Sequence, residues 1–338
     1  MNKVPGLPHD PDKRTVSGMR PTGPLHIGHY FGAIRNWMDM QREMESFFFV
    51  ADWHALTSDY ADTSRTKIYV EEMVKDWVAA GLDPEKSAIY LQSGIKELAE
   101  LHLLLSMITP LGWLERCPTY KEQQQNITGK DLANYGFLGY PVLMTADIII
   151  TRGRWVPVGA DQLPHLELSR EITRRFNSLY GEVFPEPEAR LTPAAKCPGL
   201  DGRKMSKSYN NGIFLNENPA DIEPKVRGML TDQARLRRRD PGNPDVCNLY
   251  PYHDLLTPED VRANIRSGCV SASMGCVECK DIFLKGLKIF LAPIQERRAS
   301  LDARPGIVRE ILEAGGERAG KESALTMEAV RAGMRMQY

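Results

Sequence analysis

Residues 15–30, TVSGMRPTGPLHIGHY, are the segment around which the rest of the chain is interpreted. The β-branched start predicts the end of a strand, the glycines and prolines predict a tight turn, and His26 to His29 predict the entry to a helix. Backbone N–H groups at a helix start lack partners, so they attract anions. Two imidazoles can donate to phosphate oxygens, and Gly28 leaves room for a nucleotide. The segment therefore predicts a phosphate-binding junction; two histidines beside an ordinary turn are the alternative.

A lysine-bearing segment, KMSKS at residues 204–208, follows turn-forming residues. Pro198, Gly199, Asp201 and Gly202 predict a loop before it, and a cationic loop is poorly suited to a core. Taken separately, such a loop is usually a solvated surface. Taken together with the histidine segment, it favours a shared phosphate-binding function.

Composition sets the broad class. The chain has 338 residues, 42% hydrophobic and 26% charged, which suggests about two domains of an ordinary soluble protein. Neither a run of about 18 apolar residues nor the apolar segment of a secretion signal is present, so we expect a cytoplasmic protein without a membrane partner. A net charge of −1 means that RNA contacts must come from a local basic patch, and DNA is not an expected partner.

Strands and helices alternate through the first third of the chain. Phe31, Ile34 and Trp37 recur at helical spacing and predict a helix over residues 30–45. Residues 46–51, SFFFVA, are typical of a parallel strand buried on both faces. A helix over 63–80, a strand over 88–91 and a helix over 97–108 follow. This alternation predicts an α/β fold with a doubly wound parallel sheet, and the polar residues 52–57 lie where such sheets place ligands.

The alternation stops between about residues 113 and 145, which predicts an inserted region where substrate specificity is built. This inserted region overlaps residues 140–150, YPVLMTADIII, where Asp147 is the single charged residue of an apolar helical stretch. A buried carboxylate is costly unless a donor meets it, so Asp147 should have a specific partner. The sequence leaves both an internal N–H and a bound ligand open.

Residues 156–162, VPVGADQ, again show a strand end, a glycine and polar groups at a helix start, with a well-capped helix as the alternative. Beyond residue 209 the pattern is helical, which predicts a second, bundle-like domain. Its basic cluster is either a solvated loop or, if the chain handles RNA, a phosphate contact. The cluster consists of Arg235, Arg237, Arg238 and Arg239.

The HxGH and KMSKS pair resembles the signature of the class I aminoacyl-tRNA synthetases. Across nearly its whole length the sequence is similar to the bacterial tryptophanyl-tRNA synthetase family. The matching pieces are SGMRPTGPLHIGHYFGAIRNW, ADWHALTS, GYPVLMTADIII, VPVGADQLPHLELSREITRRFN and DGRKMSKS, in this order. The related tyrosine enzymes usually carry a KFGKS-like loop and a different pocket, so these pieces favour tryptophan.

The resemblance implies a Rossmann-like catalytic fold and a reaction in two steps. Tryptophan's carboxylate attacks the α-phosphate of ATP, which is bound with Mg²⁺, and tryptophan then passes from the adenylate to tRNA(Trp). Positioning and charge neutralisation suffice for catalysis. The implied domains are a flexible lead-in (1–13), a catalytic domain (14–210) and a helical anticodon-binding domain (211–338), in a homodimer.

Site residues follow from the same resemblance. The catalytic candidates are His26, His29, Lys204, Lys207 and Lys121. The implied ATP contacts are Arg20, Pro21, Thr22, Gly28, His29, Gly159, Ala160, Asp161, Lys204, Met205, Ser206, Lys207 and Ser208. Arg20 is a departure, because many family members carry glutamine there. The implied tryptophan contacts are Asp147, Tyr140, Met144, His54, Val156, Val158 and Gln162. In this reading the indole N–H is the donor that Asp147 needs, and phenylalanine would leave the carboxylate unpaired.

Cys247, Cys269, Cys276 and Cys279 give the pattern C-x21-C-x6-C-x2-C, whereas Cys117 and Cys197 stand apart. Four thiolates with a closing C-x2-C can bind zinc or a 4Fe–4S cluster. Some bacterial members of the family carry such a cluster on four similarly spaced cysteines. The resemblance therefore favours an iron–sulfur cluster, with zinc as the alternative.

Rival classes make different demands on the sequence. Another nucleotidyltransferase with an HxGH motif should lack the combination of KMSKS and a helical tail. A non-catalytic tRNA-binding relative would not need intact His26, His29, Lys204 and Lys207. A redox protein organised around the cysteines would leave the nucleotide motifs unexplained.

Overall fold

The computed structural model describes residues 13–117, 133–191, 197–205 and 209–337. Within these ranges, five strands form one parallel sheet in the order β3-β2-β1-β4-β5. They are β1 (Arg14–Met19), β2 (Glu45–Val50), β3 (Ser87–Leu91), β4 (Trp155–Val158) and β5 (Glu188–Leu191). The chain adds β2 and β3 on one side of β1, and β4 and β5 on the other. The predicted doubly wound sheet is therefore confirmed, with its switch point between β1 and β4.

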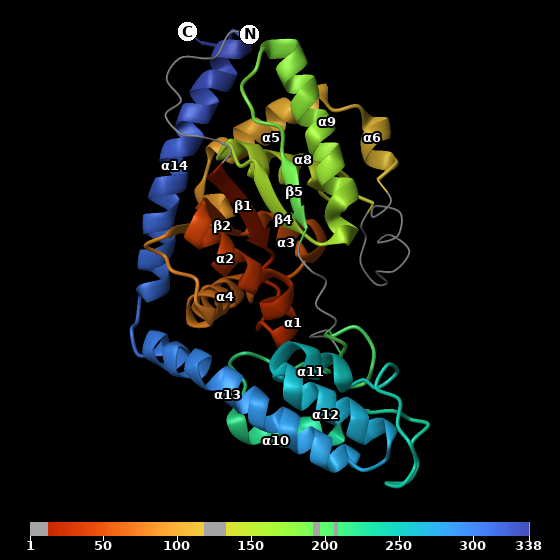
Figure 1. The fold of residues 1–338 in the computed structure, drawn as a ribbon. Coiled ribbons are helices and arrows are strands. Elements are labelled where there is room, and N and C mark those ends of the chain that lie inside the picture. Colours follow the sequence, from red (N-terminus) through yellow and green to blue (C-terminus); the bar gives the residue numbers. More distant parts are fainter. Residues whose placement is uncertain (1–12, 118–132, 192–196, 206–208, 338) are drawn as a thin grey trace.

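Helices flank this sheet and continue beyond it. Around the sheet are α1 (Ile27–His29), the π-helical η2 (Tyr30–Ile34), α2 (Arg35–Glu43), α3 (Asp52–Asp59), α4 (Thr66–Ala80), α5 (Glu97–Ile108), α6 (Leu111–Glu115), α8 (Tyr135–Ile150) and α9 (Leu163–Tyr180). Short 3₁₀ turns lie at η3 (Gln92–Gly94) and η4 (Ala160–Gln162). The later helices are α10 (Pro219–Gly228), α11 (Tyr250–Leu256), α12 (Glu259–Val270), α13 (Cys276–Asp302) and α14 (Ile307–Gly333). Figure 1 shows α10 to α13 gathered below the sheet, which confirms the helical C-terminal part.

The core lies on both faces of the sheet. Consecutive side chains of β2 point to opposite faces, and Phe47, Phe48 and Phe49 are all buried. On one face Phe48 stacks on Trp37 of α2, with ring centroids 4.8 Å apart. On the other face Phe47 and Phe49 join a cluster with α5, α8 and α9. The run SFFFVA therefore behaves as the sequence predicts for a strand buried on both sides.

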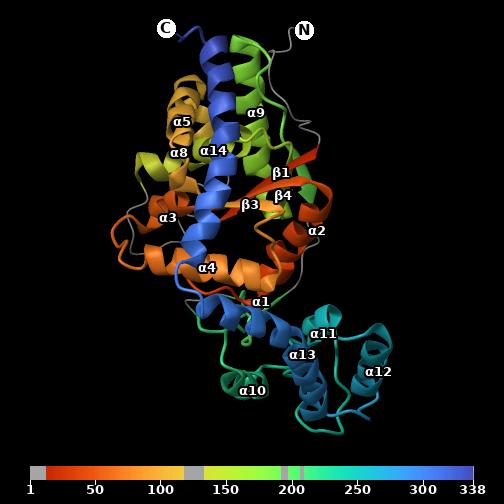
Figure 2. The ribbon, with the colours of Figure 1, turned by 90° about the vertical axis from the view of Figure 1, so that its left-hand side faces the viewer.

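The last helix, α14, leaves the helical part and packs against β3, an edge strand of the sheet (Figures 1 and 2). The approach is close: a Cβ placed on Gly315 would lie 1.9 Å from the backbone oxygen of Ile89. Covering an edge strand in this way protects it from pairing with another chain. The domain boundaries expected at residues 13, 113–145 and 210 stay predictions. No helix in the described part of the chain is long and apolar enough to cross a membrane.

Candidate active site

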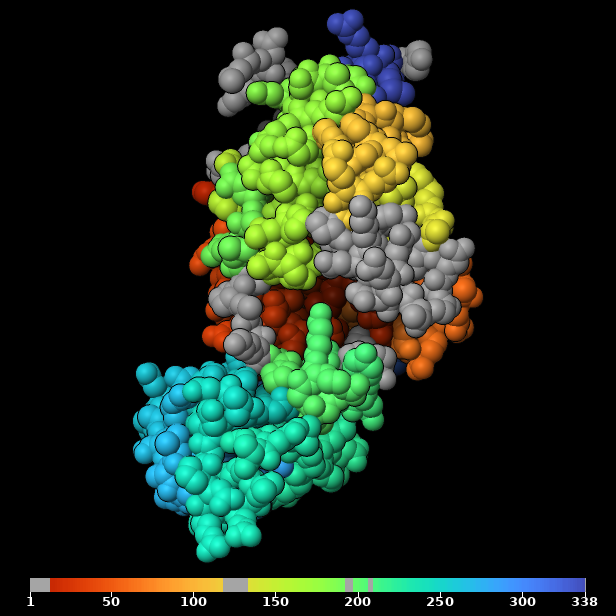
Figure 3. All heavy atoms as spheres, turned by 90° about the vertical axis from the view of Figure 1, so that its right-hand side faces the viewer, coloured from red at the N-terminus to blue at the C-terminus, as the bar shows by residue number. Residues whose placement is uncertain are grey.

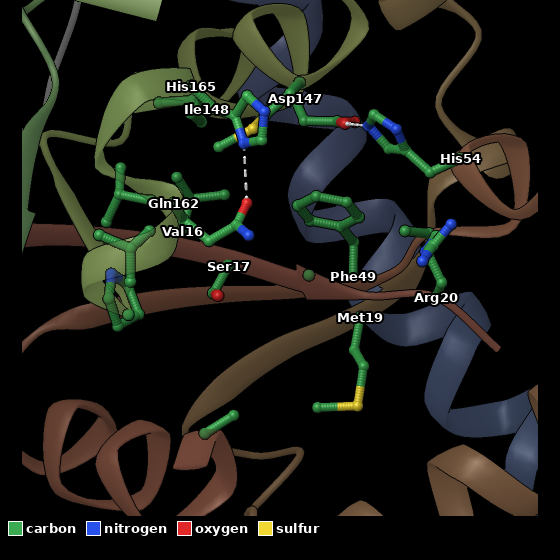
Figure 4. Close-up of a pocket in the computed structure, with 18 of the residues that line it drawn as sticks. Val16, Ser17, Met19, Arg20, Phe49, His54, Asp147, Ile148, Gln162 and His165 are labelled. Carbon is green, nitrogen blue, oxygen red and sulfur yellow. Dashed lines mark hydrogen bonds and ion pairs between the residues drawn. The ribbon is translucent and has the colours of Figure 1, made fainter. Parts of the chain in front are cut away.

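A cavity of about 380 Å³ lies at the switch point of the sheet. Its walls come from β1, the start of α3, one side of α8 and the turn after β4, as the close-up in Figure 4 shows in part. Figure 3 shows the molecular surface hollowed between the sheet-bearing part and the helical part, with atoms from early in the sequence, in red, at the floor. Open α/β sheets bind ligands at this place, and the volume suits a small-molecule site.

Asp147 on α8 lies at the cavity wall and is only 2% exposed. Its oxygen Oδ2 lies 2.8 Å from Nε2 of His54, and Nε2 of Gln92 donates to Oδ1 and Oδ2 at 2.8 and 2.9 Å. Burial raises the pKa of Asp147, whereas the hydrogen bonds from His54 and Gln92 oppose that rise. The expected partner of Asp147 is thus present inside the protein, and the carboxylate also borders the cavity.

A second series of hydrogen-bonded side chains also lies in the cavity wall. The hydroxyl of Tyr140 forms a short hydrogen bond with Nε2 of His165, and Nδ1 of His165 lies 2.9 Å from Oε1 of Gln162. Gln162 in turn donates to Asp161 at 2.9 Å. Burial lowers the pKa of His165, which favours a neutral ring. This series fixes the orientation of Tyr140 and Gln162, two of the predicted tryptophan contacts.

The histidine segment forms a self-bonded turn. The backbone N–H of His26 donates to Nδ1 of His29 at 3.1 Å, and the two rings stack with centroids 3.7 Å apart. A Cβ on Gly28 would lie 2.9 Å from Nδ1 of His26, so this position has no room for a side chain. The N–H of Ile27 donates to the carbonyl of Ile213 at 2.9 Å, which ties the segment to the chain just after residues 204–208.

The described part of the lysine segment lies near these histidines. Met205 is buried, and its Cγ lies 3.2 Å from a Cβ placed on Gly212, while Cβ of His26 lies 3.6 Å from the same point. Lys204 is exposed, and its carbonyl accepts a hydrogen bond from Asn211 at 3.2 Å. The two motifs, far apart in sequence, therefore approach each other in space.

The predicted residues divide into three groups. All seven predicted tryptophan contacts line the cavity: Asp147, Tyr140, Met144, His54, Val156, Val158 and Gln162. Of the catalytic and ATP candidates, Arg20 and Gly159 line it. The described candidates that are not part of its lining are Pro21, Thr22, His26, Gly28, His29, Ala160, Asp161, Lys204 and Met205. Lys121, Ser206, Lys207 and Ser208 lie outside the described residues. The individual roles of all these residues stay predictions.

Two polar residues of the site were missed by the sequence interpretation. Gln92 directly follows the strand at 88–91, so the rule that ligands gather at strand ends could have identified it. His165 lies in the first turn of α9, where the sequence suggests only a helix. Its role depends on Tyr140, which reaches it from another helix.

The four cysteines of the helical part meet around one small cavity of about 20 Å³. Cys276 and Cys279 lie in the first turn of α13, Cys269 lies near the end of α12, and Cys247 precedes α11. Nη1 of Arg235 lies 4.0 and 3.9 Å from the sulfurs of Cys269 and Cys276. Among the described residues, no three His, Cys, Asp or Glu side chains are arranged as ligands of a metal ion. The identity of any bound group stays a prediction.

A comparison with protein families places this fold and site in a class. The profile of the class I tRNA synthetases (W and Y) matches residues 10–292. The chain therefore belongs to the class I tRNA synthetases of the tryptophan and tyrosine group.

Relatives within this group narrow the assignment to the tryptophan branch. The tryptophan–tRNA ligase of Thermotoga maritima is 51% identical, over 96% of this chain and 100% of that protein. The tryptophan–tRNA ligase of Aquifex aeolicus is 43% identical, over 96% of this chain and 100% of that protein. A crystal structure of tryptophanyl-tRNA synthetase from Campylobacter jejuni, complexed with ADP and tryptophan, has a TM-score of 0.85 and 34% identity, covering 95% of this chain and 99% of that one. The bacterial tryptophan-type resemblance drawn from the motifs is thereby confirmed.

Proposed function

We propose that this chain is a tryptophan–tRNA ligase, which activates L-tryptophan with ATP and transfers it to tRNA(Trp). The observation that carries this function is a buried carboxylate, Asp147, at the wall of a cavity that residues 16–20 also line. The relatives of that name support the same reaction.

The reaction needs no covalent bond to the protein. A carboxylate oxygen of tryptophan attacks the α-phosphorus of ATP, the bond to the bridging oxygen breaks, and pyrophosphate leaves. The terminal ribose hydroxyl of the tRNA then attacks the tryptophanyl carbonyl, and AMP leaves. The work of the protein is to hold the two reactants together and to neutralise developing negative charge, with Mg²⁺ accompanying the triphosphate.

In this proposal, imidazole and ammonium groups bind the phosphates of ATP. We assign His26 and His29 to the reacting phosphate, and Lys204, Lys207 and Lys121 to the triphosphate. The approach of Met205 to the histidine segment supports this assignment, because it brings the lysine loop to the same end of the sheet. Interactions that tighten only as the transition state forms raise kcat rather than substrate affinity.

The proposed tryptophan-binding residues select their substrate by the shape of the pocket and by one hydrogen bond. Tyr140, Met144, Val156 and Val158 would wall the indole ring, and Asp147 would accept the indole N–H. A substrate without that donor leaves a buried acceptor unpaired, which costs more than the loss of an apolar contact.

Tryptophan-dependent exchange of pyrophosphate into ATP, followed by charging of tRNA(Trp), tests the function. We expect exchange with tryptophan and not with tyrosine. Exchange that depends on tyrosine would indicate a tyrosine-type enzyme, and tRNA binding without exchange would indicate a non-catalytic relative. Lys204→Ala and the neighbouring Arg203→Ala form a matched pair: the first should lower kcat strongly, whereas Arg203 pairs with Asp201 and should matter little.

We also propose that Cys247, Cys269, Cys276 and Cys279 hold a 4Fe–4S cluster. The four thiols border one cavity, and the guanidinium of Arg235 near two of the sulfurs would offset thiolate charge. Bound there, the cluster would serve structure or tRNA contact. An anaerobic preparation should be brown with broad visible absorption. A colourless preparation that contains zinc would overturn the cluster in favour of zinc.

The helical part is the proposed anticodon-binding region, and Arg237, Arg238 and Arg239 on its surface are exposed and suited to RNA phosphates. Their replacement should weaken tRNA binding and reduce its salt dependence, while exchange without tRNA stays unchanged. A homodimer and a cytoplasmic location remain predictions.

A further inference from the structure

Gln92 is a buried residue that no sequence motif singled out. It directly follows β3, in the turn η3, and its exposed fraction is 0%. A buried side-chain amide needs partners for both its oxygen and its nitrogen. Gln92 finds these partners on two different helices, α3 and α8.

The oxygen of the Gln92 amide faces α3. Oε1 accepts hydrogen bonds from the backbone N–H groups of Trp53 and His54, at 3.0 and 3.2 Å. These groups lie in the first turn of α3, where N–H groups have no acceptor within the helix. Because a backbone N–H can only donate, the amide oxygen must face α3 and the amide nitrogen must face Asp147. The fold therefore sets the orientation of this amide before any ligand arrives.

The nitrogen of the Gln92 amide holds the carboxylate of Asp147. Nε2 donates to Oδ1 at 2.8 Å and to Oδ2 at 2.9 Å, and Nε2 of His54 lies 2.8 Å from Oδ2. A carboxylate offers about four acceptor sites, two on each oxygen. Among the described residues, these contacts use both sites of Oδ2 and one site of Oδ1. One site of Oδ1 is left for a donor in the cavity.

We propose that Gln92 is a positioning residue that determines specificity for tryptophan, because it fixes the Asp147 carboxylate with one Oδ1 site available to the indole N–H. This inference rests on the proposed function and explains the selectivity of that site. The terminal torsion of an aspartate is broad, so an unclamped carboxylate could turn to meet other donors. A carboxylate that is fixed in this way cannot turn, and a ring without a matching N–H leaves the remaining Oδ1 site unpaired.

The variant Gln92→Met tests whether the Gln92 amide fixes the Asp147 carboxylate, an interaction called the clamp below. Methionine is unbranched and of similar length but forms no comparable hydrogen bonds. We expect KM for tryptophan in pyrophosphate exchange to rise about tenfold or more, and the preference for tryptophan over phenylalanine to fall by a similar factor. The KM for ATP should stay within about twofold of the wild-type value, because the substitution removes no interaction that binds ATP.

Gln41→Met is the matched control. Gln41 also joins separate elements through its side-chain amide, donating to the carbonyl of Gly81 at 3.1 Å and accepting from the N–H of Asp83 at 3.0 Å. Its partners Gly81 and Asp83 are not part of the cavity lining, whereas His54 and Asp147, the partners of Gln92, are. Gln41→Met should therefore lower thermal stability and leave both KM values and the selectivity unchanged.

Gln92→Glu separates the two halves of the clamp. It keeps an acceptor oxygen for α3 and places a second acid against Asp147. At low pH the two acids share a proton, so one can still donate to the other, whereas at high pH both ionise and repel. Relative to wild type, its selectivity should fall as the pH rises from about 6 to about 9. Normalising to wild type removes the titration of the other groups around this pocket: His54 and Asp52 on α3, Tyr90 on β3, His102 on α5 and His165 on α9.

The outcomes separate this inference from the function on which it rests. If the wild-type chain shows no tryptophan-dependent exchange, both proposals fail. If the wild type exchanges but Gln92→Met behaves like Gln41→Met, or raises KM for ATP and tryptophan equally, the inference alone is wrong. Should Gln92→Met not fold, Gln92→Glu decides, because a selectivity ratio independent of pH would overturn the clamp.

Discussion

Two carboxylates in this protein are buried to nearly the same extent but have different hydrogen-bond and ion-pair partners. Asp147 on α8 and Asp76 on α4 are 2% and 1% exposed, and burial raises the pKa of both. Asp147 is held by the amide of Gln92 and the imidazole of His54. Asp76 accepts a hydrogen bond from the N–H of Leu25, the residue before His26, at 3.2 Å, and forms an ion pair with Arg298 of α13.

The different partners of the two acids indicate different roles: Asp147 is suited to bind a ligand, whereas Asp76 links two helices of the fold. Arg298 forms ion pairs with Asp76, Glu72 and Asp302, so it meets Asp76 with a full positive charge and joins α4 to α13. Asp147 borders the cavity and receives no full charge from Gln92, whereas Asp76 is not part of that cavity lining. A buried acid that a side-chain amide holds beside a cavity can still accept a hydrogen bond from a ligand. A buried acid that is neutralised by a guanidinium serves the fold.

The largest effect should come from Arg298→Met. This change leaves Asp76 buried without its cation, and removing one partner of a buried ion pair typically costs about 3–5 kcal/mol. We expect the free energy of unfolding to fall by that amount, measured by urea denaturation with intrinsic fluorescence.

Arg297→Met provides the comparison for that measurement. Arg297 is the neighbouring residue on α13, and its Nε donates to the carbonyl of Ala79 at 2.6 Å. Within the described part of the chain, it forms no ion pair with a buried acid. We expect a loss of about 1 kcal/mol. Equal losses for the two variants would show that the buried charge of Asp76 is not what makes Arg298 important.

The next effect should be on substrate selection. Asp147→Ala removes the acceptor of the indole N–H, so we expect KM for tryptophan to rise and the preference for tryptophan over phenylalanine to fall by about a hundredfold. Pyrophosphate exchange with each amino acid measures both. Thr145→Ala on the same helix is the control, because Thr145 is buried against Ser169 and is not part of the cavity lining. An unchanged tryptophan dependence in Asp147→Ala would reject its role.

A smaller effect should appear in the pH dependence of stability. Burial raises the pKa of Asp76 to about 6 in the folded protein, above its ordinary value of 3.8. The folded protein therefore holds this proton more tightly than the unfolded chain does. The resulting stabilisation is present at low pH and is lost as the pH rises through about 6.

The Arg298→Met variant makes this dependence measurable. Loss of the guanidinium should raise the pKa of Asp76 further, and a protonated Asp76 needs no cation. We therefore expect the stability deficit of Arg298→Met against wild type to be about 1–2 kcal/mol smaller at a pH of about 5 than at a pH of about 8. Urea denaturation at both pH values tests this, and a deficit that does not change with pH would contradict it.

The two acids also differ in what the sequence could predict. Asp147 was identified because an isolated charge in the apolar run YPVLMTADIII demands a partner. Asp76 lies in VEEMVKDWVAA, where charges recur and a solvated helix face is the ordinary interpretation. Its burial depends on Arg298, which lies 222 residues later. Periodicity describes neighbours along a helix and cannot detect such a distant partner.

The same limit applies to the fold. The doubly wound sheet followed from local alternation, and α14 was expected as a helix. That α14 packs against β3 could not be inferred, because its tight packing depends on Gly315 meeting the backbone of Ile89. The seven residues that the resemblance assigns to tryptophan all line one cavity, and they lie in contiguous motifs, whereas Gln92 lies outside those motifs. Their roles in binding stay predictions.

The smallest effect should come from Asp302→Asn, the outermost acid on Arg298. Asp302 forms two ion pairs, with Arg298 at 3.2 Å and with Lys75 at 2.7 Å, but it is 47% exposed. Exposed pairs contribute about 0–1 kcal/mol, so the unfolding free energy should change by less than about 1 kcal/mol. Glu72→Gln is the comparison, because Glu72 has one pair with Arg298 at 2.5 Å and is 28% exposed. If burial governs these interactions, Glu72→Gln should cost more although it removes fewer ion pairs. A larger loss for Asp302→Asn would mean that the number of ion pairs, rather than their burial, determines the strength of the link between α4 and α13.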